Sequence, residues 1–363
     1  MRWRYQKWDD FLVAAEGGFN GLLKLFNFLL LQAAGDVDQV LQWMNYLQDR
    51  GMINPDIDLE QFWSRLEDEK LIRRDAGGGH SLTRRGEQRI RKESLELIFR
   101  NLDKGGFGQH RVSHTGEGGE LTTETRGYRS GDPLTRIDAL STMSKAIKRG
   151  GLDEIVLQEQ DFEVYESEHF SSCATVLLID ISHSMILYGE DRITPAKQVA
   201  LALSELIMTR FARDSLHVAS FGDDAKLIDV GSIPYLRVGP YHTNTKAGLQ
   251  LAQSVLRAER NANKQIFMIT DGKPSAIFEN GRIYKNSFEL DSKIVNQTLN
   301  EAAECNRHGI VITTFMVTED PYLVDFVDKL SQINHGRAYY AAPGELGDYI
   351  FADYVQNRRR GVR

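Results

Sequence analysis

Residues 173–184, which read CATVLLIDISHS, constrain the possible folds of this chain more than any other stretch. Residues 175–179 form an unbroken apolar and β-branched run, a pattern typical of a strand buried on both faces within a parallel sheet. The run ends in Asp180, Ser182 and Ser184, so three oxygen-bearing side chains alternate at the carboxyl end of this strand. Open α/β sheets bind their ligands at that end. One carboxylate and two hydroxyls there predict a site for Mg²⁺ or Mn²⁺.

Two residues further along the chain complete this set. Thr243 lies just before a helix-like stretch, and Asp271 follows a second buried run at residues 265–270. The resulting order, Asp-x-Ser-x-Ser, then Thr, then Asp, resembles the von Willebrand factor A (vWA) domain and its metal-ion-dependent adhesion site. The resemblance covers roughly residues 171–343. It implies that one divalent ion is held by Asp180, Ser182, Ser184, Thr243 and Asp271.

The resemblance also implies what such a site does. In the family the hydroxyls coordinate the ion directly, while the two aspartates act directly or through water. Neutral hydroxyl ligands leave the charge of the ion incompletely neutralised, and one coordination position stays free. An acidic side chain of a partner protein completes the shell. We therefore expect a non-catalytic, divalent-metal-dependent module for protein–protein interaction.

The region from residue 171 onward alternates strand-like and helix-like stretches with short connections. This alternation predicts an α/β fold with a Rossmann-like, doubly wound and mostly parallel sheet covered on both faces. The first strand would be central, which places Asp180 at the topological switch point. Strands are expected at residues 174–179, 216–221, 227–230, 265–270, 310–317 and 338–341, and helices from about Pro195 and around residues 249–256, 294–299, 323–331 and 346–356.

Residues near the expected metal ligands have alternative interpretations. Thr245 competes with Thr243 for the metal role, but we expect it to be the N-cap of the following helix. His183 lies between the two serines and is expected to point away from the ion. Asp223 and Asp224 follow the second strand, either at the rim of the site or in a solvated turn, and the solvated turn is favoured.

An enzymatic function, such as metal-dependent phosphoester hydrolysis, is a further hypothesis to weigh against a binding module. Phosphatases of the haloacid dehalogenase type place Asp-x-Asp after a buried strand, with the second aspartate as the acid. Ser182 occupies that second position here, so the general acid is missing. The sequence also lacks a Walker loop of the Gly-x-x-x-x-Gly-Lys-Ser type. Any ATPase activity is therefore expected in a partner.

Residues 1–100 are expected to form a mainly helical region. Apolar residues recur at helical spacing over residues 22–30 and again over residues 40–47, and Asp58 is placed to cap a third helix. A short strand, a glycine turn at residues 77–79, a second short strand and another helix follow. This order resembles the end of a winged helix.

A winged-helix-like region raises the alternative of a DNA-binding regulator in which the vWA domain is a sensor. Residues 1–100 hold 15 Lys and Arg against 16 Asp and Glu, so the region as a whole is not basic. A protein-docking surface is therefore favoured over DNA contact. A local basic cluster keeps the alternative open, and it consists of Arg84, Arg85, Arg89, Arg91 and Lys92.

Residues 101–170 connect the two regions, which divides the chain into residues 1–100, 101–170 and 171–363. The Gly-rich residues 103–131 are expected to be a linker, or an extended segment that orders against a partner. Asp132 and Pro133 predict the start of a helix through Ile147, and acidic and apolar residues alternate over residues 161–169 as in an edge strand. This helix and edge strand, which precede the vWA domain, resemble the corresponding segment of bacterial CoxE-like and MoxR-associated proteins.

The finer resemblance implies a partner. MoxR-associated proteins work with an AAA+ ATPase, so we expect an adaptor for a MoxR-type ATPase in the remodelling or metal insertion of a client. The partner, or its client, would offer the Asp or Glu carboxylate.

Composition limits the partners and the cellular compartment that we expect for this chain. The net charge of −7 argues against broad non-specific nucleic-acid affinity, and only two cysteines in 363 residues indicate a reducing compartment. The longest apolar stretch, residues 22–34, is interrupted by Lys24 and Asn27 and is shorter than the ~20 residues that a membrane span needs. The first residues show no signal-peptide pattern. We expect a cytoplasmic protein without a membrane partner.

Overall fold

The computed structural model describes residues 18–104, 120–128, 137–151, 157–168, 172–189, 191–211, 213–271, 273–279, 281–286, 291–317 and 321–340, with Ile350 and Tyr354. The chain divides into two compact units, one of residues 1–108 with 172–354 and one of residues 109–171 with 355–363. Compactness does not report independent folding, so the three-part division proposed from the sequence stays a prediction.

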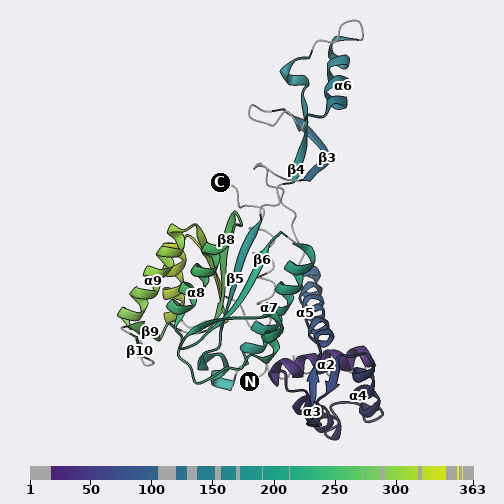
Figure 1. Cartoon of the computed structure of the whole chain (residues 1–363), viewed down its shortest axis with the longest axis vertical. Helices are drawn as coiled ribbons and strands as arrows, with labels where there is room; N and C mark the ends of the chain where they lie inside the picture. The colour runs from purple at the N-terminus through teal and green to yellow at the C-terminus, as the bar shows by residue number, and fades with distance from the viewer. Residues whose placement is uncertain are drawn as a thin grey trace. The chain divides into compact units, whose positions relative to one another are not determined.

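A six-stranded sheet is the centre of the first unit (Figure 1). Its order is β12-β11-β8-β5-β6-β7, and all neighbours pair in parallel except β7, which runs antiparallel to β6 at one edge. This confirms the expected mostly parallel, doubly wound sheet. Because β5 lies between β6 and β8, its carboxyl end is at the switch point, as predicted. The strands are β5 (Cys173–Asp180), β6 (Ser215–Phe221), β7 (Ala225–Ile228), β8 (Asn263–Thr270), β11 (Ile310–Met316) and β12 (Arg337–Tyr340).

Strand β5 is buried along its whole length because helices cover both faces of the sheet. Leu177 and Ile179 belong to a hydrophobic core with α7, whereas Val176 and Leu178 belong to a second core with α8, α9 and α10. Successive side chains of a strand point to opposite faces, which explains the unbroken apolar run. The helices are α7 (Ile193–Arg210), α8 (Thr245–Ala258), α9 (Ser292–Arg307) and α10 (Pro321–Asn334).

The N-terminal helical region packs on the α7 face. Leu25, Leu30 and Met44 belong to the same hydrophobic core as α7, and α5 lies beside α7 (Figure 1). Asp58 caps α4 as predicted, since its side chain accepts a hydrogen bond from Gln61 N at 2.9 Å. The expected order of helices, short hairpin and helix is present. The elements are α2 (Phe19–Gln32), α3 (Val37–Asp49), α4 (Leu59–Asp68), β1 (Ile72–Arg74), β2 (His80–Leu82) and α5 (Arg84–Lys104).

The second unit corrects two expectations. Strand β4 (Glu163–Glu168) is present, and it pairs antiparallel with β3 (Glu120–Gly127). Strand β3 falls in the segment expected to be a linker or an extended segment that orders against a partner, and it is extended but pairs within the chain itself. The two strands lie far apart in the chain, and local sequence patterns do not report such pairing. Helix α6 spans Ala139–Gly150, so it begins later than predicted.

Asp138 explains the late start of α6. Its carboxylate accepts a hydrogen bond from Leu140 N at 3.0 Å, while Ile137 forms a β-bridge with Val164 instead of a helical turn. A capping carboxylate and a strand-like neighbour therefore set the boundary. Asp132 and Pro133, the predicted start, lie outside the described residues.

Two further features complete the first unit. A hairpin of β9 (Ala276–Glu279) and β10 (Arg282–Lys285), which the sequence analysis did not anticipate, follows β8. Of residues 346–356, expected to form a last helix, the structure describes Ile350 and Tyr354, and both are helical and buried. Among the described helices, none combines the length and apolar character needed to span a bilayer.

Candidate functional site

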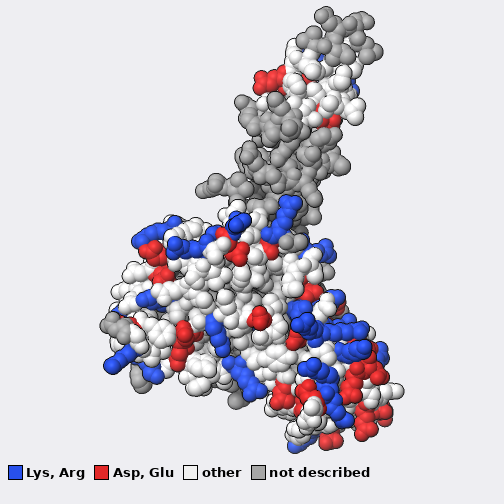
Figure 2. Space-filling view, viewed as in Figure 1, with Lys and Arg blue, Asp and Glu red and all other residues white. Residues whose placement is uncertain are grey.

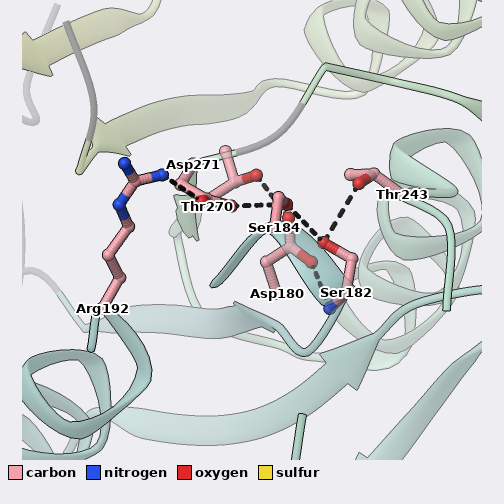
Figure 3. A network of polar contacts seen from close by, with 7 residues as sticks. All are labelled: Asp180, Ser182, Ser184, Arg192, Thr243, Thr270 and Asp271. Atoms are coloured by element: carbon pink, nitrogen blue, oxygen red, sulfur yellow. Dashed lines mark hydrogen bonds and ion pairs between the residues drawn. The ribbon is translucent and has the colours of Figure 1, made fainter. Parts of the chain in front are cut away.

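The carboxyl ends of β5 and β8 bring the five predicted metal ligands together (Figure 3). Asp180 is the last residue of β5, and Ser182 and Ser184 follow in the loop and the short helix after it. Asp271 follows β8, the direct parallel neighbour of β5. Thr243 lies in the loop before α8. Adjacent parallel strands end at the same edge of a sheet, so residues almost 90 positions apart meet there.

Short oxygen–oxygen contacts link four of these side chains in series. Thr243 Oγ1 donates to Ser182 Oγ at 3.1 Å, and Ser182 Oγ lies 3.0 Å from Ser184 Oγ. Ser184 Oγ in turn donates to Asp271 Oδ1 at 2.7 Å. The set that the sequence predicted is therefore a single cluster in space.

Asp180 is fixed at the base of this cluster. Its Oδ1 accepts a hydrogen bond from Ser182 N at 2.8 Å, and its Oδ2 accepts one from Thr270 Oγ1 at 2.5 Å. The side chain is fully buried, whereas Ser184 is only partly buried. Thr270 was not identified from the sequence, because a threonine that ends an apolar strand looks like any other β-branched core residue.

The donor set fits a hard divalent ion. Six oxygens at ~2.0–2.1 Å in an octahedron have neighbours about 2.9 Å apart. The three oxygen–oxygen contacts of 3.1, 3.0 and 2.7 Å are ordinary hydrogen-bond lengths, and an ion could replace the shared protons without large movement of these oxygens. Hydroxyl and carboxylate oxygens are also the ligand type that Mg²⁺ and Mn²⁺ prefer.

Burial changes the protonation of the two carboxyls. Removal from water, followed by the nearby charge of Asp271, raises the pKa of Asp180 from its ordinary 3.8 to about 7. Burial also raises the pKa of Asp271, although hydrogen bonds from Ser184 and Arg192 oppose that shift. Two buried carboxylates so close together repel each other unless a cation lies near them.

The raised pKa of Asp180 predicts how the metal-free chain responds to pH. Between pH about 4 and about 7 the folded chain retains a proton that the unfolded chain releases, so this group's contribution to stability falls as pH rises through that window. We expect a loss of up to about 1.4 kcal/mol per pH unit relative to Asp180→Asn, which cannot titrate. Urea unfolding of both proteins in chelator, from pH 4.5 to pH 8, measures the difference. Parallel pH profiles would contradict the prediction.

Arg192 is the main site residue that the sequence analysis missed. It is the N-cap residue of α7, and its guanidinium donates to Asp271 Oδ2 (Figure 3). The arginine side chain is 11% exposed and that of Asp271 is 0% exposed, so this ion pair is largely withdrawn from water. No motif surrounds Arg192, and the contact spans 79 positions in the chain, so the sequence carried no signal for it.

The loop that carries Thr243 is held by neighbours on both sides. Thr243 N donates to Ser275 Oγ at 2.9 Å, and His242 N donates to Asp223 Oδ1 at 2.7 Å. Asp223 therefore does more than form the solvated turn that was favoured, because its carboxylate fixes the start of this loop. Its position relative to His242 depends on the folded chain and is not visible in the sequence.

The predicted N-cap of α8 is also corrected. Asn244, not Thr245, caps the helix, since its side chain accepts a hydrogen bond from Ala247 N at 3.0 Å. Thr245 is the first helical residue and is buried. His183 is exposed, and its N–H donates to the carbonyl of Tyr241 at 3.1 Å.

Comparison with known families gives two matches. A family model described as the vWA domain of Rv0959-like proteins matches residues 173–355, and one described as the third domain of Rv0959-like proteins matches residues 120–167. The first match covers all five predicted metal ligands. The second covers strand β3 and strand β4 except for its last residue, Glu168.

Curated relatives come from mycobacteria. The uncharacterized protein Rv0959 of Mycobacterium tuberculosis (strain ATCC 25618 / H37Rv) is 29% identical over 304 residues, which cover 81% of this chain and 44% of that protein. Protein Mb0984 of Mycobacterium bovis gives the same values. The chain therefore spans less than half the length of these relatives.

Solved structures with similar folds were also found. The PilB minor pilin of Streptococcus sanguinis aligns with a TM-score of 0.42 and 17% identity, covering 55% of this chain and 65% of the pilin. The von Willebrand factor domain of the pilus tip protein Mfa5 from Porphyromonas gingivalis aligns with a TM-score of 0.40 and 14% identity, covering 54% of this chain and 98% of that domain.

Proposed function

The chain belongs to the Rv0959-like family of vWA domain proteins, and we propose that its vWA domain binds a protein partner in a manner that depends on Mg²⁺ or Mn²⁺. A vWA domain indicates a protein-interaction module. We propose in addition that this binding depends on a metal ion and that the partner offers an acidic side chain. The ligands are Asp180, Ser182, Ser184, Thr243 and Asp271.

One observation carries the proposal. Three hydroxyls and two carboxylates from three separate segments converge at the switch point of the sheet, and hydrogen bonds of 2.7–3.1 Å join four of these side chains in one cluster of hard oxygen ligands. A purely structural cluster of this kind is costly, because it keeps a fully buried carboxyl beside a second one. Arg192 offsets part of that cost through Asp271, and a bound divalent cation would offset more of it.

Each side chain has a distinct part in the proposed site. Asp180, held by Ser182 N and Thr270 Oγ1, supplies negative charge at the base. The three hydroxyls supply neutral oxygens, so they position the ion without cancelling its charge. A bound divalent ion supplies a Lewis-acidic position for an Asp or Glu carboxylate of the partner. Because Ser184 is the partly exposed member, the partner would approach from its side.

The proposed partner is an AAA+ ATPase of the MoxR type, or its client. This rests on the resemblance of residues 132–169 to the segment that precedes the vWA domain in CoxE-like and MoxR-associated proteins. The chain would then be an adaptor, and the ATPase would supply nucleotide hydrolysis for remodelling or metal insertion. We assign no catalytic residue to this chain.

Affinity capture from native cell extract tests this function. We expect tagged wild-type protein to retain an AAA+ ATPase in millimolar Mg²⁺ and to lose it in excess chelator. Asp180→Asn as bait should lose the same protein in Mg²⁺, which separates a metal effect on this chain from one on the ATPase. Identical captures under all three conditions would contradict metal-dependent binding.

The DNA-binding alternative receives less support from the structure. Arg91 is nearly buried in an ion pair with Glu205, and Arg89 pairs with Glu93 at 3.3 Å. Two of the five cations of the basic cluster are therefore already paired within the chain. Figure 2 shows Lys and Arg close to Asp and Glu over the N-terminal helices, so the face in view is not uniformly basic. Salt-dependent DNA binding that is lost on neutralising Arg84 and Arg85 would revive this alternative.

A further inference from the structure

We propose that Arg192 weakens metal binding in the partner-free vWA domain, so that the ion and an acidic partner bind cooperatively. The inference rests on the proposed function of the same site. Its starting point is the buried contact between the Arg192 guanidinium and Asp271 Oδ2, on the opposite side of this carboxylate from Ser184 (Figure 3). One cluster oxygen is thus already paired with a cation of the chain itself.

Counting charges shows the consequence. With both carboxylates ionised, Asp180, Asp271 and Arg192 together carry one net negative charge. A divalent ion would turn this into one net positive charge, and a partner carboxylate would bring it to zero. Without the arginine, the ion alone would already make the site neutral, and the carboxylate would leave it negative. With Arg192 present, the site therefore becomes neutral only when both the ion and an acidic ligand are bound, whereas without it the ion alone is sufficient.

Burial makes this effect large. Charges in a site withdrawn from water interact more strongly than charges at the surface, because solvent screens them less. The arginine side chain is 11% exposed, and Arg192 also lies at the N-terminus of α7, where the helix dipole adds positive potential. Both sources oppose a cation and favour an anion at the same place.

The structure also shows why Arg192 stays in this position. Its backbone N–H donates to the carbonyl of Met185 at 3.1 Å, and the carboxylate of Asp191 accepts from Thr194 N at 3.0 Å. Asp191 also accepts from Gln32 of α2 at 3.3 Å. The guanidinium is therefore presented from the fixed first turn of a buried helix and not from a free loop.

A purely structural role for the pair makes a different prediction. If Arg192 only fastens α7 to the sheet, its replacement lowers the melting temperature and leaves metal affinity unchanged or weaker. If it acts as proposed, replacement by a neutral residue of similar size tightens metal binding. The two roles therefore differ in the sign of the affinity change.

Calorimetric titration with Mn²⁺, without any partner, is the test. Arg192→Gln should bind Mn²⁺ about tenfold more tightly than wild type, whereas Arg192→Lys should stay within about threefold because it keeps the charge. Arg210→Gln is the matched control, since it removes the same charge from the exposed far end of α7, about 27 Å away. Equal or weaker binding by a folded Arg192→Gln protein would overturn the proposal.

A second measurement does not depend on how the variants fold. Wild-type protein is titrated with Mn²⁺ in sodium acetate and in sodium chloride of equal ionic strength, with acetate as the probe for a partner carboxylate. We expect the affinity for Mn²⁺ to rise severalfold in acetate after correction for Mn²⁺–acetate association. Unchanged affinity in acetate contradicts the coupling while leaving the metal site intact. Absence of Mn²⁺ binding in both salts contradicts the proposed function itself, and the inference with it.

Discussion

Replacing Asp180 with asparagine is expected to abolish binding of Mg²⁺ and Mn²⁺, with a loss of affinity of at least about a hundredfold. The carboxylate is fully buried at the base of the cluster, with Oδ1 and Oδ2 oriented by Ser182 N and Thr270 Oγ1. An amide removes one of the two negative charges of the site and presents N–H donors where acceptors are needed. Calorimetric titration of the purified chain with Mn²⁺ measures the loss directly.

The control for this variant is Asp224→Asn. Asp224 is exposed, lies in the turn after β6 at the same edge of the sheet, and accepts a hydrogen bond only from the neighbouring Ala225 N among the bonds described for its carboxylate. The Asp224→Asn protein should bind Mn²⁺ with the same affinity as wild type. Asp180→Asn itself should remain folded in chelator at neutral pH, because the neutral amide relieves the burial of a charged group. Retention of Mn²⁺ affinity within threefold by folded Asp180→Asn would show that the ligand assignment is wrong.

The central sheet could be predicted because its signals are local. The apolar run of β5 is continuous since Leu177 and Val176 face opposite cores, and each core is closed by helices with their own apolar periodicity. Strand β3 gave no such signal. Its partner β4 lies beyond a helix in the chain. The residues of β3 are rich in threonine and charge, so β3 was interpreted as part of a linker or an extended segment.

The same distinction applies to the site. The five predicted ligands could be found because their order and spacing resemble a known motif, and the sheet then brings them together. Arg192, Thr270 and Asp223 could not be found in this way. Each acts through a contact that exists only in the folded chain, with Asp271, Asp180 and His242 respectively. These contacts shape the electrostatics of the cluster, so sequence reasoning identified the five side chains that come together but not the charge balance around them.

The packing of the N-terminal helices on the vWA domain rests in part on one largely buried ion pair. Arg91 of α5 contacts Glu205 of α7 at 3.2 Å, with side-chain exposures of 14% and 4%. Arg91→Met is expected to lower the free energy of unfolding by about 3–5 kcal/mol, since it leaves the Glu205 carboxylate buried without this partner. Urea unfolding at neutral pH measures the change. Arg307→Met is the surface control, because the Arg307–Glu304 pair is largely exposed and should contribute at most about 1 kcal/mol.

A double substitution separates the loss of attraction from the burial of an unpaired charge. Replacing Arg91 with Met and Glu205 with Leu removes both charges and keeps apolar volume between α5 and α7, so most of the lost stability should return. If the double variant is as unstable as Arg91→Met alone, the packing of the arginine stem and not the ion pair carries the effect. Recovery to within about 1 kcal/mol of wild type would instead show that the pair specifies how the helices dock more than it strengthens the docking.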